Sequence, residues 1–150
     1  MEKLELKHLA PYMPYNLGCY LQGHKDEDDR PIKETILGLY DETETEVYVS
    51  LNEFDYETYI IFDVFPILRP LSDLTKEIEH NGEKFIPIKY LQNNYSCFGF
   101  DYNNEEGFVL NTDVVNYKYL PYMILYKLFE WHFDVFNLRE NDLCIYYNEL

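Results

Sequence analysis

Cysteine is scarce in this sequence of 150 residues, and the cysteines present follow no disulfide or metal-site spacing. Cys19, Cys97 and Cys144 are odd in number and far apart, with no Cys-x-x-Cys pair. That pattern excludes a disulfide framework and a zinc ribbon, and it is typical of free thiols in a reducing compartment. The Gly-x-Ser-x-Gly, P-loop and dinucleotide-binding glycine motifs are missing as well. The sequence therefore predicts no catalytic residue, no metal site and no cofactor.

Long apolar runs are also missing. Residues 1–8 lack the apolar stretch of a signal peptide. The uncharged stretches fall well short of the ~20 residues that a membrane helix needs. We therefore expect a cytoplasmic protein without a membrane partner.

Basic residues are few. Lys and Arg number 12 against 28 Asp and Glu, which gives a net charge of −16 and an isoelectric point near 4.4. Direct binding of nucleic acid is disfavoured, because its affinity depends on Lys and Arg meeting phosphates. An acidic chain is instead attracted to basic protein surfaces, over a Debye length of ~8 Å at physiological salt. We expect a partner protein with a basic surface.

What the sequence does contain is material for a folded core. Apolar residues make up 47% of the chain and aromatic residues 18%, and a chain of this length is expected to form a single globular domain over residues 1–150. Short β-prone runs separated by polar loops at residues 19–22, 32–40 and 47–51 predict an antiparallel meander. The runs 96–102 and 108–110 flank residues 103–107 and predict a second hairpin, and 143–147 predicts a last strand. The run 59–68 contains Pro66 and is predicted to be an edge strand or an extended loop.

Two helices are predicted. A short one covers about 72–80, because Leu71, Leu74 and Ile78 form one apolar stripe and Asn81-Gly82 is a stop signal. A long one covers about 120–137, because apolar residues recur there three or four apart, at Leu120, Ile124, Leu128, Trp131 and Val135. The predicted fold class is α+β: an antiparallel β-sheet or meander packed on one long carboxyl-terminal helix plus the short helix.

Negative charge is concentrated between Asp26 and Asp63. This stretch holds thirteen acids against Arg30 and Lys33, a net charge of −11 out of −16. Tyrosines lie among the acids, and Tyr supplies rigid contact area while carboxylates pair with Arg. The alternative is that the acids serve only to keep the protein in solution. The residues predicted to bind a partner are Asp26, Glu27, Asp28, Asp29, Tyr40, Asp41, Glu42, Glu44, Glu46, Tyr48, Glu53, Asp55 and Tyr56.

Other polar groups have structural interpretations. The run 26–29 lacks the ligand offsets and turn glycine of a calcium loop, and the segment 101–107 has its glycine one position late, so we interpret both as turns. Glu130 and Asp134 lie four apart on the predicted helix, where they are interpreted either as a carboxylate pair or as part of a solvated helix face. His132 is predicted to be a core or boundary histidine, and the sequence indicates no partner for it.

Several blocks of the chain resemble a family of short bacteriophage- and prophage-encoded proteins to which no activity is assigned. The blocks are residues 4–15, 66–79, 81–85 and 131–136. The resemblance implies expression in the cytosol of a bacterial host and supplies no catalytic residues. The match is weakest over the acidic stretch 26–63, where a host-dependent function would be expected.

Three functions follow as hypotheses. The first is a phage accessory protein that binds and inhibits a basic host protein that handles nucleic acid. Its sharpest version is an anti-CRISPR inhibitor of an RNA-guided nuclease, because such effectors hold guide and target in positively charged channels. The second is a non-catalytic structural or assembly protein of the phage. The third is a metal-dependent enzyme, which no motif supports.

Overall fold

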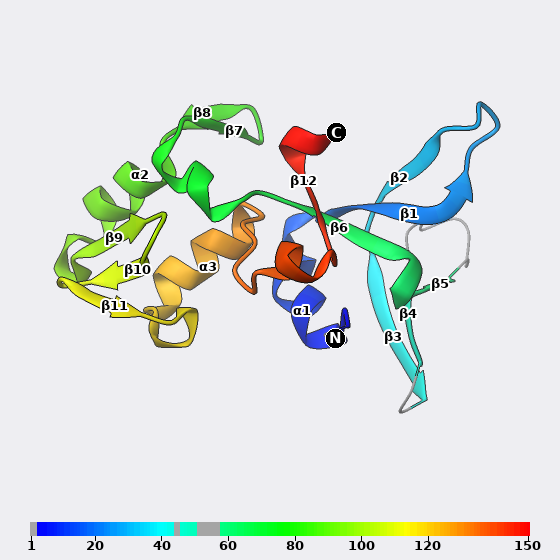
Figure 1. The fold of residues 1–150 in the computed structure, drawn as a ribbon, viewed down its shortest axis with the longest axis horizontal. Coiled ribbons are helices and arrows are strands. Elements are labelled where there is room, and N and C mark those ends of the chain that lie inside the picture. The colour runs from blue at the N-terminus through cyan, green and yellow to red at the C-terminus, as the bar shows by residue number, and fades with distance from the viewer. Residues whose placement is uncertain (1–2, 44–45, 51–57) are drawn as a thin grey trace. The chain divides into compact units, whose positions relative to one another are not determined.

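The structure is a computed structural model that describes residues 3–43, 46–50 and 58–150, with the backbone alone described for 40–43, 46–50 and 58. The chain forms two compact units (Figure 1). The first unit contains Met1–Leu68 and Phe136–Leu150, and the second contains Arg69–Val135. The single domain predicted from the length stays a prediction.

The first unit is built mainly of strands joined by short helical turns. Its elements before residue 69 are α1 (Leu6–Leu9), the 3₁₀ helix η1 (Ala10–Tyr15), β1 (Gly18–Lys25), β2 (Pro31–Thr35), β3 (Gly38–Thr43), β4 (Glu46–Ser50), β5 (Thr58–Ile60), η2 (Ile61–Asp63) and β6 (Val64–Leu68). The chain returns to this unit in η6 (Leu138–Asn141), β12 (Ile145–Tyr146) and η7 (Tyr147–Glu149).

A four-stranded sheet with the order β12-β6-β1-β2 forms the centre of the first unit. Strands β1 and β6 are antiparallel, and β12 pairs in parallel with β6 at Ile67 and Leu68. Strands β3, β4 and β5 form a separate antiparallel meander. The meander predicted for this part of the chain is thus present, although the predicted run 32–40 is divided between β2 and β3.

The edge position predicted for the run 59–68 is wrong for β6, which lies between two strands. Pro66 is opposite Cys19 of β1, whereas β12 pairs only with the two residues that follow Pro66. At Pro66 the strand therefore has a ladder partner on the β1 side alone. A proline is tolerated there because it need not donate a hydrogen bond to a second strand.

The second unit contains two α-helices, several 3₁₀ turns and two small antiparallel sheets. Its elements are η3 (Leu71–Thr75), β7 (Ile78–His80), β8 (Glu83–Phe85), α2 (Pro87–Asn94), η4 (Ser96–Phe98), β9 (Phe100–Asn103), β10 (Gly107–Leu110), β11 (Asp113–Val115), η5 (Tyr117–Tyr119) and α3 (Tyr122–Glu130). The sheets are β7-β8 and β11-β10-β9. The hairpin predicted around residues 103–107 is confirmed as β9 and β10.

The core of the second unit gathers along one face of α3. Leu120, Ile124, Leu128 and Trp131 are buried together, as their spacing predicts, with apolar side chains from α2, β9 and β10. These partners include Leu91, Phe100 and Phe108. The apolar face of the helix thus supplies the core against which the small sheets pack.

The long helix predicted for 120–137 is wrong, because α3 ends at Glu130. His132 has a φ of +61°, which an α-helix does not allow, and Phe133 forms a parallel bridge with Arg69. Asp134 is 1% exposed, so the solvated helix face predicted for it is also wrong, whereas the Glu130 side chain stays partly exposed at the end of α3. Residues 131–135 are all buried, and they form a return segment of turns on either side of the Phe133 bridge instead of continuing the helix.

The short helix predicted for 72–80 is wrong as well. A 3₁₀ helix covers Leu71–Thr75, and Ile78–His80 is a strand that pairs with Glu83–Phe85. Asn81 and Gly82 have φ values of +50° and +81°, which places two left-handed residues in a two-residue hairpin loop. An Asn-Gly pair strongly favours such a turn.

The fold is therefore a mixture of helices and mostly antiparallel sheets, and the predicted α+β class is confirmed at this level. Among the described residues, no helix has both the length and the apolar composition needed to cross a membrane.

Candidate functional site

The acidic run 26–29 forms an ordered turn between β1 and β2. The Asp26 carboxylate accepts hydrogen bonds from the backbone N–H groups of Asp28 and Arg30, each at 2.9 Å. Asp29 lies in the left-handed region with a φ of +63°, and its carboxylate is 2.8 Å from the Lys25 ammonium. The loop predicted here is confirmed, and the Asp26 carboxylate holds its backbone in place.

These roles divide the four predicted acids into two kinds. Asp26 is used by the turn and Asp29 is paired with Lys25, whereas Glu27 and Asp28 present exposed carboxylates at the tip. An exposed ion pair contributes little to stability, so the pairing of Asp29 mainly reduces the local charge. Glu27 and Asp28 are therefore the two acids of this turn best placed to meet a partner.

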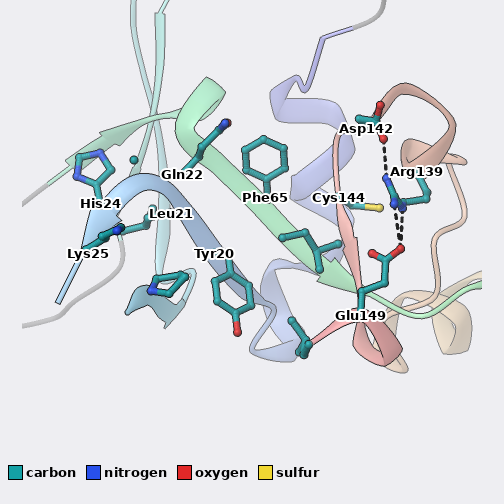
Figure 2. Close-up of a pocket in the computed structure, with 14 residues that line it drawn as sticks. Tyr20, Leu21, Gln22, His24, Lys25, Phe65, Arg139, Asp142, Cys144 and Glu149 are labelled. Carbon is teal, nitrogen blue, oxygen red and sulfur yellow. Dashed lines mark hydrogen bonds and ion pairs between the residues drawn. The ribbon is translucent and has the colours of Figure 1, made fainter. Parts of the chain in front are cut away.

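A pocket of about 620 Å³ lies beside this turn, within the first unit (Figure 2). Its walls come from β1, β6, β12 and the carboxyl-terminal segment. The lining is largely apolar, and it consists of Tyr20, Leu21, Gln22, Gly23, His24, Lys25, Pro31, Phe65, Arg139, Asp142, Cys144, Ile145, Glu149 and Leu150. Lys25 precedes residues 26–30 and Pro31 follows them, and both line the pocket, so the turn adjoins the pocket at both of its ends.

An irregularity in β1 shapes one wall of the pocket. The pairing register with β2 shifts between Tyr20 and Lys25, and Gly23 within this interval has a φ of +77°. A glycine adopts this conformation readily, and such a bulge bends a strand and redirects its side chains. Gln22, His24 and Lys25 consequently line the pocket from one side.

Arg139 organises the opposite wall. Its Nη1 donates to Asp142 Oδ1 at 2.6 Å, and its Nη2 donates to Glu149 Oε1 at 2.9 Å (Figure 2). The backbone N–H of Tyr146 donates to the other Glu149 oxygen at 3.0 Å. These bonds, first that of Tyr146 and then those of Arg139, lower the pKa of Glu149. The guanidinium is thus engaged by two carboxylates of its own chain.

His24 stands on the β1 side of the pocket. Its Nε2 is 3.7 Å from Asp63 Oδ2, and its ring meets the Tyr59 ring edge to face at 5.1 Å. No group of three side chains suited to holding a metal ion occurs among the described residues. His24 lines the β1 wall of the pocket.

The turn beside the pocket is acidic, whereas the charges that line the pocket cancel. Asp26, Glu27, Asp28 and Asp29 against Arg30 give the turn a net charge of −3, and Lys25 and Arg139 balance Asp142 and Glu149 in the lining. An apolar hollow with this border suits a cationic ligand that carries an apolar group.

A second polar cluster lies in the second unit, around Arg69. The Arg69 guanidinium donates to the backbone carbonyls of Trp131 at 3.2 Å and Glu79 at 2.7 Å. The His80 ring meets the buried His132 ring edge to face at 5.1 Å. Sequence reasoning missed this partner of His132, because the pattern of residues 72–80 predicts a helix where the structure has β7. The cluster ties the return segment after α3 to the β7-β8 hairpin.

The chemistry of this cluster is that of a structural junction. Burial, and next the positive charge of Arg69, lower the pKa of His80, against the opposing effect of Glu130. A neutral His80 is compatible with the adjacent guanidinium. The Arg69 guanidinium donates to the backbone carbonyls of Trp131 and Glu79, and these hydrogen bonds hold the return segment against the β7-β8 hairpin.

The remaining predicted partner-binding residues are not placed. Four of them lie outside the described residues: Glu44, Glu53, Asp55 and Tyr56. For five others the structure describes the backbone alone: Tyr40, Asp41, Glu42, Glu46 and Tyr48. The pocket was not predicted from the sequence, because its walls come from three segments far apart in the chain. The one local signal for it is Gly23 inside a strand pattern, which indicates a bulge.

No protein-family model, curated protein or solved structure matches this chain.

Proposed function

We propose that this chain is a non-catalytic, phage-encoded accessory protein that binds and inhibits a basic host protein through the acidic turn of its first unit. The observation that carries the proposal is the ordered Asp26–Asp29 turn, which holds Glu27 and Asp28 exposed at the border of an apolar pocket. An ordered acidic surface binds a basic partner at a lower entropic cost than a disordered loop.

The sharpest form of the proposal is an anti-CRISPR inhibitor of an RNA-guided nuclease. Such a nuclease holds its guide–target duplex in a positively charged channel, to which an acidic surface is complementary. The resemblance of residues 4–15, 66–79, 81–85 and 131–136 to phage proteins supports this setting. The net charge of −16 supports it too, because a chain with this charge does not favour binding to the nucleic acid itself, and the basic protein surface is the better target.

Charge reversal at the turn tests the proposal. Glu27→Lys together with Asp28→Lys changes the charge by four units at exposed positions and leaves the Asp26 hydrogen bonds in place. We expect binding to a basic protein captured from the bacterial host to weaken about tenfold or more, with a shallower dependence on salt. Affinity purification identifies the partner, and titration of the purified pair at two salt concentrations measures the change.

A matched control is available in the second unit. Glu105 and Glu106 are exposed in the β9-β10 turn, and reversing both makes the same change in net charge. We expect this control to bind nearly as well as the unmodified chain. Equal losses in both variants would show that net charge alone attracts the partner, and full binding by both would remove the turn from the interface. For the anti-CRISPR form, the added chain should stop target cleavage by the host's RNA-guided nuclease.

One observation favours the second candidate, a phage structural or assembly protein. Tyr122, Met123 and Tyr126 are exposed on α3 and Tyr119 is exposed in η5 just before it, and Tyr119 and Tyr122 are each 76% exposed. Exposed aromatic side chains are enriched where proteins associate. This candidate predicts self-association in size-exclusion chromatography and the presence of the chain in purified virions, whereas an inhibitor should be absent from virions.

A further inference from the structure

We infer that the pocket of the first unit receives an aromatic side chain from an extended, basic segment of the partner. This inference rests on the proposed function and names the part of the partner that the site recognises. Glu27 and Asp28 then meet the flanking cations, and the pocket holds the anchor.

The size and lining of the pocket support an apolar anchor. A volume of about 620 Å³ is in the range of sites that enclose a ligand, roughly 300–1,000 Å³. Leu21, Phe65 and Ile145 supply apolar surface from three different strands. An aromatic side chain in such a hollow buries a large area with few rotatable bonds, which is why aromatic anchors dominate many interfaces.

The charges around the pocket decide which flanking residues accompany the anchor. Arg139 is held by Asp142 and Glu149, and Lys25 is held by Asp29, so each cation of the pocket wall already has a carboxylate. An anionic segment would gain little from these cations and would meet an adjoining turn, residues 26–30, whose net charge is −3. Lysine or arginine beside the anchor instead meets the exposed Glu27 and Asp28.

Three labelled peptides and the full chain test the inference by fluorescence anisotropy. The probes have the sequences Lys-Lys-Trp-Lys-Lys, Lys-Lys-Gly-Lys-Lys and Glu-Glu-Trp-Glu-Glu. We expect the first to bind at least about tenfold more tightly than either of the others, a difference of about 1.4 kcal/mol. Equal binding of the two basic peptides would overturn the inference, because charge alone would then account for it. Equal binding of the acidic peptide would overturn the predicted flanking charges.

A pocket-filling variant locates the binding. Gln22 is exposed and lines the pocket from β1, so Gln22→Trp enlarges a side chain there without repacking the core. The control is Val114→Trp, at a 56% exposed strand position of the second unit. We expect Gln22→Trp to remove the preference for the tryptophan peptide and the control to retain it. An unchanged preference in a folded Gln22→Trp chain would place the anchor elsewhere.

Failure of this inference and failure of the proposed function give different results. Capture of a basic host protein that is lost on reversal of Glu27 and Asp28 but unchanged in Gln22→Trp would overturn the pocket anchor and retain the proposed function. Selective binding of the tryptophan peptide by a chain that captures no basic host protein would retain the pocket anchor and overturn the proposed function.

Discussion

Replacement of Leu128 by Ala should destabilise the second unit by roughly 2–5 kcal/mol. Leu128 is 0% exposed on the inner face of α3 and belongs to the core of that unit. The substitution removes three carbons, and about 0.8 kcal/mol per buried carbon gives about 2.4 kcal/mol before the cavity is counted. The cavity adds to this cost to the extent that the surrounding side chains cannot close it.

Trp131 makes this prediction directly measurable. It is the one tryptophan in the sequence, and it is 5% exposed within the same core, so its fluorescence reports unfolding of the second unit. Urea titration should show an earlier midpoint for Leu128→Ala than for the unmodified chain. Met123→Ala is the matched control, because Met123 is 48% exposed on the same helix.

The control should change the free energy of unfolding by no more than about 0.5 kcal/mol. A cost below about 1 kcal/mol for Leu128→Ala would refute the reasoning, since it would mean that the inner face of α3 is not closely packed. The first unit should keep its partner binding in a Leu128→Ala chain that remains folded. Loss of binding by that folded chain would assign recognition to the second unit.

Two further predictions concern titration and thiol reactivity. Because burial and then Arg69 lower the pKa of His80 from 6.5, the unfolded chain binds this proton more readily, and the resulting stability is lost as the pH falls below about 6.5. The urea midpoint should fall more between pH 7.5 and 5.5 in the unmodified chain than in His80→Gln, and equal falls would contradict this. Cys97 is exposed, whereas burial and then Glu34 raise the pKa of Cys19 to about 12. A thiol reagent should therefore modify Cys97 much faster in the folded chain, and similar rates for both would count against the described burial.

The buried face of α3 could be predicted from the sequence because helical periodicity is a local property. The end of the helix could not be predicted from the same pattern, since Trp131 and Val135 continue the spacing after the helix has stopped. The backbone turns at Trp131 and His132 instead, and Phe133 pairs with Arg69, 64 positions earlier in the sequence, which a local pattern does not reveal.

The hairpin at residues 78–85 shows a different limit. Asn81-Gly82 ends a helix or forms a hairpin loop, because both need left-handed backbone. The stripe of Leu71, Leu74 and Ile78 favoured the helix. In the structure, the first two belong to a 3₁₀ turn and Ile78 begins a strand, so residues from two elements share one core and imitate a single helical face.

The candidate site was predicted only in its local part. Four neighbouring acids in a polar run predict an exposed turn, and the turn is present. Composition does not specify the backbone geometry that makes Asp26 a hydrogen-bond acceptor within the turn, pairs Asp29 with Lys25 and leaves Glu27 and Asp28 exposed. The pocket depends on Phe65 and residues 139–150 meeting β1, which is a property of the tertiary fold.

The bridge between Arg69 and Phe133 closes the second unit upon itself. The Arg69 N–H donates to the His132 carbonyl at 2.7 Å, and the Arg69 carbonyl accepts from the Asp134 N–H at 2.9 Å. The first and last residues of this unit are therefore adjacent, which is the geometry of a cassette inserted into another sequence. A unit whose ends lie close together can be inserted or replaced by a short linker without a change in the backbone on either side of it. The acidic turn and the helical core thus lie in different units, and the chain enters and leaves the second unit at neighbouring positions.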